Sequence, residues 1–334
     1  MARRRGKKTK AKRMTKREPV QRYLYYELPV GDAGTGNSFY LDLSAGLSAI
    51  NRRLYRQGRT YHVANATVID TSGQLTSARF CTLPDLWTTH KGWQLMFNAW
   101  KDQRARTLEN SPNYVTGRWA DFKVWMSEQH FIDANTLDLA KSGGILPVFS
   151  DMDSVPDGEW EISDISTVIG GVEYENRQLW MMGDHNIGGG GTHPTEQGFG
   201  VLTALREMLQ QPPESPILPG DFKDSVVMGM NPNAGADLND DILDNIATDN
   251  DLPPYDKTVV IGANHTAANS NSIAVREVGW ATGAKGIASL PTMGFPVPLG
   301  LLECRFTSSG DTTNVGVMLE LVPGSYKGVH AEAF

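Results

Sequence analysis

The chain has 334 residues, with 31 Lys and Arg against 38 Asp and Glu, and a formal net charge of −7. This length allows a sizeable hydrophobic core, in one large all-β domain or two smaller domains. Hydrophobic residues at 40% and charged residues at 21% are typical of a soluble globular protein and exclude a fully disordered chain. Because no run of eighteen apolar residues occurs, we expect no membrane span. The 34 Gly and 18 Pro indicate many turns and favour a β-rich fold.

The charge is divided sharply along the chain. The first seventeen residues, MARRRGKKTKAKRMTKR, include no acid and ten basic residues: Arg3, Arg4, Arg5, Lys7, Lys8, Lys10, Lys12, Arg13, Lys16 and Arg17. Subtracting these ten leaves 21 basic residues against 38 acidic residues, a net charge of −17 for the remainder. Because like charges repel and little apolar surface is available to bury, we expect residues 1–21 to be a disordered arm. The arm predicts binding to a polyanion and also fits a nuclear localisation signal.

The first half of the remaining chain predicts strands and one short helix. The aromatic run RYLYYEL at 22–28 predicts the first strand. Apolar residues at helical spacing predict a helix at 44–55. Strands are expected at 61–69 and 75–82, and we interpret them as partners in a hairpin.

The strongest helical pattern lies at 88–109. Four large apolar residues recur there on one face: Trp93, Met96, Phe97 and Trp100. Such a face can stack on nucleic-acid bases, but it more often packs into a core, which is the interpretation we favour. The same interpretation applies to the aromatic residues of a strand expected at 119–126, which are Trp119, Phe122 and Trp125.

The second half predicts short strands separated by long loops. One helix is expected at 196–210, and strands at 160–169, 178–182, 225–230, 257–262, 272–281, 300–306 and 315–322. Many short strands without β-α-β alternation predict an antiparallel sandwich, a class that includes the jelly roll. The expected fold is therefore all-β: a jelly-roll shell domain at 22–334 with helical insertions, preceded by the arm. Residues 184–256 are expected to form either a surface projection or long loops.

Local motifs for catalysis are absent from the sequence. The segment from Gly279 to Lys285 lacks the spacing of a phosphate-binding loop, and Gly286 follows where a hydroxyl is required. No G-x-S-x-G, H-E-x-x-H or C-x-x-C motif occurs, so we expect no enzyme. Cys81 and Cys304 predict small, buried apolar residues in a reducing compartment.

Three acidic residues are the weak candidates for metal ligands: Asp237, Asp240 and Asp241. They begin an acidic segment at 237–256 that is similar to a calcium loop, but Ile242 stands where an EF-hand requires glycine. Calcium at subunit contacts is one hypothesis for this segment, and a solvated acidic loop is the favoured one. His185 and His193 flank a four-glycine run, which we interpret as a solvated loop rather than a metal site. No other cofactor is expected.

The arm MARRRGKKTKAKR, the strand RYLYYEL and the C-terminal run VMLELVPGSYKGVHAE together resemble the capsid proteins of small icosahedral viruses. The chain looks most like those of circular, Rep-encoding single-stranded DNA (CRESS-DNA) viruses. The resemblance covers the organisation of the whole chain, and its one sharp motif is the arm. It implies a jelly roll whose copies assemble into a closed shell, with the arm directed inward onto a viral genome. It also implies a location in the virion and in the host nucleus during assembly, and a host receptor.

The resemblance implies further basic residues on the interior of a shell, because ten charges in each arm neutralise only part of a genome of ordinary size. The candidates are Arg52, Arg53, Arg56, Arg59 and the basic cluster at 101–106. Ordinary solvated surface is the alternative interpretation for both groups.

Three functional hypotheses stay open. The leading one is a capsid subunit that packages single-stranded DNA, although shell proteins of small RNA viruses share the same plan. The second is a non-viral nucleic-acid-binding protein whose basic tail coats nucleic acid without a closed shell. The third is an enzyme whose site is built from residues distant in sequence. Particle formation separates the first hypothesis from the others, and turnover would support the third.

Overall fold

The computed structural model describes residues 19–30, 37–70, 72–111, 117, 119–135, 146–148, 162–169, 172–185, 198–210, 260–263, 273–279, 288–309 and 314–334. The arm residues 3–17, the strand expected at 225–230 and the acidic segment 237–256 lie outside these ranges. The described part is rich in antiparallel sheet, which is compatible with an all-β sandwich.

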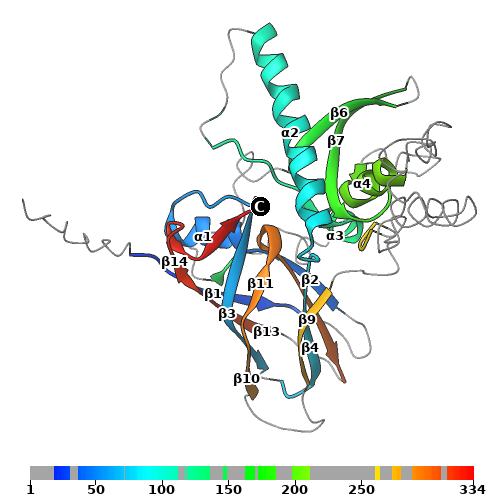
Figure 1. Ribbon diagram of the computed structural model, residues 1–334. Helices are drawn as coiled ribbons and strands as arrows, with labels where there is room; N and C mark the ends of the chain where they lie inside the picture. The colour runs from blue at the N-terminus through cyan, green and yellow to red at the C-terminus, as the bar shows by residue number, and fades with distance from the viewer. Residues whose placement is uncertain are drawn as a thin grey trace, which may run out of the picture.

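Two antiparallel sheets face each other across a shared hydrophobic core (Figure 1). The first has the order β1-β13-β3-β10 and contains β1 (Tyr23–Leu28), β13 (Val315–Leu321), β3 (Arg59–Asp70) and β10 (Ala288–Thr292). Two further strands pair with β3 in this sheet: β11 (Phe295–Val297) and β16 (Ala331–Ala333). The second sheet has the order β2-β12-β4-β9 and contains β2 (Asn37–Asp42), β12 (Leu301–Ser308), β4 (Leu75–Thr82) and β9 (Ile273–Gly279).

The first four strands pair with later strands in reverse order along the chain. Strand β1 pairs with β13, β2 with β12, β3 with β10 and β4 with β9, and all four pairs are antiparallel. The hairpin expected between 61–69 and 75–82 is therefore wrong, because β3 and β4 belong to different sheets. Each of them bonds on both sides to strands that come much later in the sequence.

Alternating side chains fill the space between the two sheets. Leu24 and Tyr26 of β1 are fully buried there, together with apolar residues from strands of both sheets. The rings of Phe80 and Phe295 meet across this core, with centroids 5.8 Å apart, one from each sheet. Burial of this contiguous apolar surface is the main force that holds the sheets together.

A second layer is formed by the chain between β4 and β9 (Figure 1). It contains the helices α2 (Trp87–Asn110), α3 (Glu128–Asn135) and α4 (Val201–Gln210), and a small sheet of β5 (Trp125–Ser127), β6 (Asp164–Ile169), β7 (Val172–Met182) and β8 (Gly198–Gly200). Strands β5 and β8 run parallel to β7, which the all-antiparallel expectation did not include. Tyr40 and Leu301 join this layer, whereas their neighbours Leu41 and Leu302 join the core between the sheets. The second layer therefore packs at Tyr40 and Leu301 on the outer face of the sheet that contains β2 and β12, whereas Arg79 of β4 and Glu277 of β9 in the same sheet are exposed.

The aromatic face of α2 packs in this second core, as predicted. Trp93 and Trp100 are buried, and both rings contact Phe122. Cys81 and Cys304 are both buried and are not joined in a disulfide, which confirms the burial predicted for them. Of the helices in the described ranges, none has both the length and the apolarity needed to cross a membrane.

Several expected elements differ from the structure in length or type. The strand at 119–126 is reduced to β5, and Trp119 is 49% exposed rather than part of a core. The helix at 196–210 begins only at Val201, because the preceding residues pair with β7 as β8. A strand was expected at 257–262, and only its last three residues are described. They lie in a turn, in which the Ala263 N–H donates to the Val260 carbonyl.

Helix α1 (Leu43–Asn51) lies beside the first sheet and matches the helix expected at 44–55, although it is shorter. Its N-terminus is fixed by Asp42, whose carboxylate accepts hydrogen bonds from the backbone N–H groups of Ser44 and Ala45. The helix ends at Arg52, which has a left-handed backbone conformation with φ of 51°. This end of α1 adjoins the chain that leads to the arm.

Candidate nucleic-acid interface and a histidine cluster

The chain from the arm joins the folded body beside the C-terminal end of α1. The Gln21 N–H donates to Asn51 Oδ1 at 2.8 Å, and Asn51 Nδ2 donates back to the Gln21 carbonyl at 3.0 Å. Val20 packs on the core between the sheets and lies against Gly328, where an added Cβ would collide with it. These contacts lie on the arm side of the boundary expected between residues 21 and 22. They fix the point from which the arm departs.

Five basic residues gather near this point, and we call them the arm-entry patch: Arg52, Arg53, Arg56, Arg59 and Lys327. Arg52 directly follows the Asn51 that binds Gln21, and both Arg52 and Arg53 are exposed. Partial burial, followed by the nearby charges of Arg56, Arg53 and Arg59, lowers the pKa of Lys327. The patch is therefore a region of concentrated positive charge on a body whose overall charge is negative.

Tyr326 contacts three members of the patch, namely Arg56, Arg59 and Lys327. The Arg59 guanidinium lies 3.7 Å from the centroid of the Tyr326 ring, and the Lys327 ammonium lies 5.4 Å from it. The Tyr326 hydroxyl accepts a hydrogen bond from the Arg56 backbone N–H at 3.1 Å. The Arg56 side chain forms an ion pair with Asp121 at 2.9 Å. Cation–π contacts and hydrogen bonds of this kind offset the repulsion between neighbouring cations.

Two members of the patch occupy backbone conformations that usually favour glycine. Arg52 has φ of 51° and Lys327 has φ of 49°. In this left-handed region a side chain with a Cβ costs about 1 kcal/mol relative to glycine. A side chain at either of these positions therefore lowers stability relative to glycine.

The structure divides the interior basic residues proposed from the sequence into two groups. Arg52, Arg53, Arg56 and Arg59 come together in the arm-entry patch, whereas the cluster at 101–106 lies on the exposed later half of α2. Figure 1 shows that part of α2 extending away from α1. Sequence reasoning missed Lys327, because its place in the patch depends on contacts with residues about 270 positions earlier.

Most of the predicted metal candidates, namely His193, Asp237, Asp240 and Asp241, lie outside the described ranges. His185 is described, and its Nε2 lies 3.2 Å from a carboxylate oxygen of Glu207. Its Nδ1 accepts a hydrogen bond from the Gly200 N–H at 3.1 Å. His185 is thus held by one carboxylate and one backbone group, an arrangement that orients a ring without requiring a metal.

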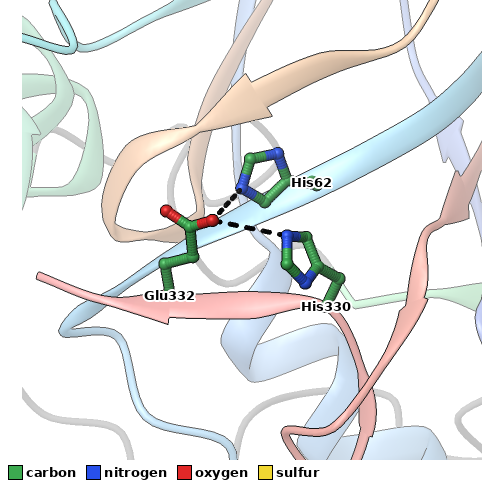
Figure 2. A group of neighbouring side chains, drawn as sticks. All are labelled: His62, His330 and Glu332. Carbon is green, nitrogen blue, oxygen red and sulfur yellow. Dashed lines mark ion pairs between the residues drawn. The ribbon is translucent and has the colours of Figure 1, made fainter.

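Two histidines and a glutamate lie close together where β3 meets the C-terminal strand β16 (Figure 2). His62 belongs to β3, His330 precedes β16, and Glu332 belongs to β16. Glu332 Oε1 lies 4.0 Å from His62 Nε2 and 3.5 Å from His330 Nε2. Burial, followed by the charge of His330, lowers the pKa of His62. Within the described ranges this is the one group of three potential metal ligands.

The comparison of the chain with protein-family models, with curated proteins and with solved structures gave no match.

Proposed function

We propose that this chain is a jelly-roll capsid protein that assembles into an icosahedral shell and packages a viral genome through its basic N-terminal arm. The pairing of the strands is the observation that carries the proposal. A jelly roll is an antiparallel ribbon rolled into two facing four-stranded sheets, so its early strands pair with its late strands in reverse order. The pairs β1–β13, β2–β12, β3–β10 and β4–β9 have this order.

The distribution of charge supports the packaging role. The arm carries ten positive charges, and the remainder of the chain has a net charge of −17. The arm-entry patch extends the positive region from the arm onto the folded body at the point where Gln21 and Asn51 join. Because phosphate contacts of Lys and Arg supply sequence-independent affinity, this arrangement favours a genome on the side of the shell where the arm departs. Single-stranded DNA is the expected cargo.

Several large apolar residues are available on the surface for contacts between subunits. Met293 is 79% exposed and Trp87 is 56% exposed, next to the partly exposed Leu86. Large apolar side chains on a surface are protected from water when a neighbouring subunit covers them. These residues are therefore our first candidates for contacts between subunits.

The proposal is tested with three versions of the full chain expressed under the same conditions. They are the natural chain, a chain without residues 1–17, and a chain of full length in which the ten basic arm residues are replaced by Gln. Negative-stain electron microscopy reports particles, and nuclease digestion followed by ultraviolet absorbance reports protected nucleic acid. We expect closed, filled particles from the natural chain and empty or irregular particles from both variants. The Gln variant separates the charge of the arm from its length.

Small discrete oligomers from all three versions, over a range of salt and pH, would contradict a capsid. Salt-sensitive nucleic-acid binding that is lost with the arm would then favour the non-viral binding protein. Digestion of the released cargo with DNase and with RNase identifies its chemistry. RNA cargo in closed particles would retain the capsid proposal and correct the expected genome.

A further inference from the structure

The register between β16 and β3 brings two histidines and a glutamate together. Ala331 lies opposite Tyr61 and Glu332 lies opposite Thr60. One step along the same register places His330 opposite His62, and their ring centroids are 4.6 Å apart. Because alternate residues of a strand share one face, Glu332 lies on the same side as His330 and diagonally across from His62. Figure 2 shows the Glu332 carboxylate pointing at both rings.

The distances between the three donor atoms are close to those of a metal site. Zinc is bound at about 2.0–2.2 Å by imidazole nitrogen and carboxylate oxygen, which places tetrahedral donors about 3.4 Å apart. The Glu332 oxygen lies 4.0 Å from the His62 nitrogen and 3.5 Å from the His330 nitrogen, and all three donors lie within 4.8 Å of one another. The Glu332 side chain is 66% exposed, so the carboxylate is free to adjust when a cation enters.

The surroundings of the cluster favour a cation. Nε2 of His62 is buried and has no hydrogen-bond donor or acceptor within bonding distance. Asp85 lies near enough to act on the charge of His62, which adds a second carboxylate to the local field. Burial disfavours the charged form of His62 and lowers its pKa, and neutral imidazole is the form that binds metal.

We propose that His62, His330 and Glu332 form a binding site for Zn²⁺ or a similar transition-metal ion, which fastens the C-terminal strand β16 to β3. Two imidazole ligands favour Zn²⁺, Co²⁺, Ni²⁺ or Cu²⁺ over Ca²⁺ and Mg²⁺, which prefer sites made of oxygen ligands. Three protein ligands leave a fourth position for water.

The position of β16 gives such a site a structural consequence. Strand β16 spans only three residues, so its pairing with β3 offers few hydrogen bonds. It leads directly to Phe334, whose ring stacks on His90 with centroids 4.0 Å apart and meets Trp93 at 5.6 Å. The Arg59 side chain of the arm-entry patch donates to the Ala331 carbonyl. A metal that joins His62 to His330 and Glu332 would therefore stabilise the end of the chain against both the first sheet and α2.

The test uses the untagged full chain, freed of metal with a chelator and then titrated with Zn²⁺ alone by calorimetry. We expect one Zn²⁺ per chain, a rise in Tm on binding, and no competition from Ca²⁺ or Mg²⁺ in excess. The variants His62→Asn, His330→Asn and Glu332→Gln should each weaken Zn²⁺ binding by about tenfold or more. Co²⁺ should give the visible absorption of a low-coordinate site in the natural chain and lose it in the variants.

The matched control is the double variant His185→Asn/Glu207→Gln, which removes another histidine–carboxylate pair at a similar distance. It should leave the stoichiometry and affinity unchanged. His330 and Glu332 are both substantially exposed, so their variants should fold even where His62→Asn does not. Thermal unfolding in the presence of chelator checks that the metal-free variants have the same Tm as the metal-free natural chain. Absence of stoichiometric binding, or binding that survives all three ligand variants, would overturn the site.

Discussion

Arg52 combines a basic side chain, an exposed position beside the arm and a backbone conformation suited to glycine. If the side chain serves nucleic-acid binding, removing it should change stability and affinity in opposite directions. We expect Arg52→Gly to raise the free energy of unfolding by up to about 1 kcal/mol, because the strain at φ of 51° is relieved. The same variant should bind single-stranded DNA more weakly. Denaturant unfolding and fluorescence anisotropy with a labelled oligonucleotide measure the two effects.

The control for this variant is Asn176→Gly, because Asn176 has φ of 52° on β7 and carries no charge. It should relieve strain of the same kind while the affinity for DNA stays as it was. If the Arg52→Gly variant binds DNA with unchanged affinity, Arg52 does not contribute to the interface, and its backbone conformation has no functional reason.

His130 is a buried titratable group in the second layer. Its ring stacks on Tyr40 with centroids 4.2 Å apart, and its Nδ1 accepts a hydrogen bond from the Met126 N–H at 3.3 Å. Burial lowers the pKa of His130 to about 3. Below pH 6.5 the unfolded chain therefore binds a proton at this residue that the folded chain does not bind until about pH 3. Stability should fall as the pH falls through this window, by up to about 1.4 kcal/mol per pH unit.

The variant His130→Phe keeps an aromatic ring against Tyr40 and removes the titrating group. We expect the loss of stability between pH 7 and pH 5 to become smaller by about 2 kcal/mol than in the natural chain. Chemical unfolding at several pH values measures this difference, with light scattering to confirm a constant state of assembly. A pH dependence that is identical in both chains would show that His130 does not control acid stability.

At the scale of elements, the sequence predicts those helices and strands whose pattern of apolar residues lies within one continuous segment. The spacing of Trp93 and Trp100 predicts α2, because both lie on its single apolar face. The aromatic and β-branched runs likewise predict β1, β4, β12 and β13. Strand β2 was missed, because Phe39 faces one core and Tyr40 the other. A strand buried on both faces has no alternation of apolar and polar residues from which to recognise it.

The pairing of strands could not be predicted in the same way. Tyr23 lies opposite Glu320, and the energy of such a pair depends on residues that are far apart in the sequence. The hairpin was expected because β3 and β4 are close in sequence. Closeness in sequence does not show that each strand pairs instead with strands that come later in the chain. The histidine cluster was hidden for the same reason, since only His330 and Glu332 are close in sequence. The arm-entry patch was predicted in part, because four of its members lie within residues 52–59.

At the scale of the whole molecule, positive charge is concentrated in the arm and at the place where the arm joins the body. If all ten arm charges engage single-stranded DNA, the slope of log K against log salt is about −7, and the five residues of the patch add about −3.5. The natural chain should therefore show a slope of about −10.5, and the chain without residues 1–17 a slope of about −3.5. A short oligonucleotide, at a protein concentration where light scattering detects no particles, keeps assembly out of the measurement.

The contribution of the patch is isolated by a pair of double variants that each remove two charges. Arg52→Gln/Arg53→Gln lies beside the arm and should make the slope less steep by about 1.4. Lys101→Gln/Arg106→Gln lies on the later half of α2, away from α1, and should leave the slope unchanged (Figure 1). Equal effects from both pairs would mean that DNA binds basic residues anywhere on the folded body, without a preference for the arm-entry patch. An effect from the α2 pair alone would move the interface to that helix and separate it from the arm.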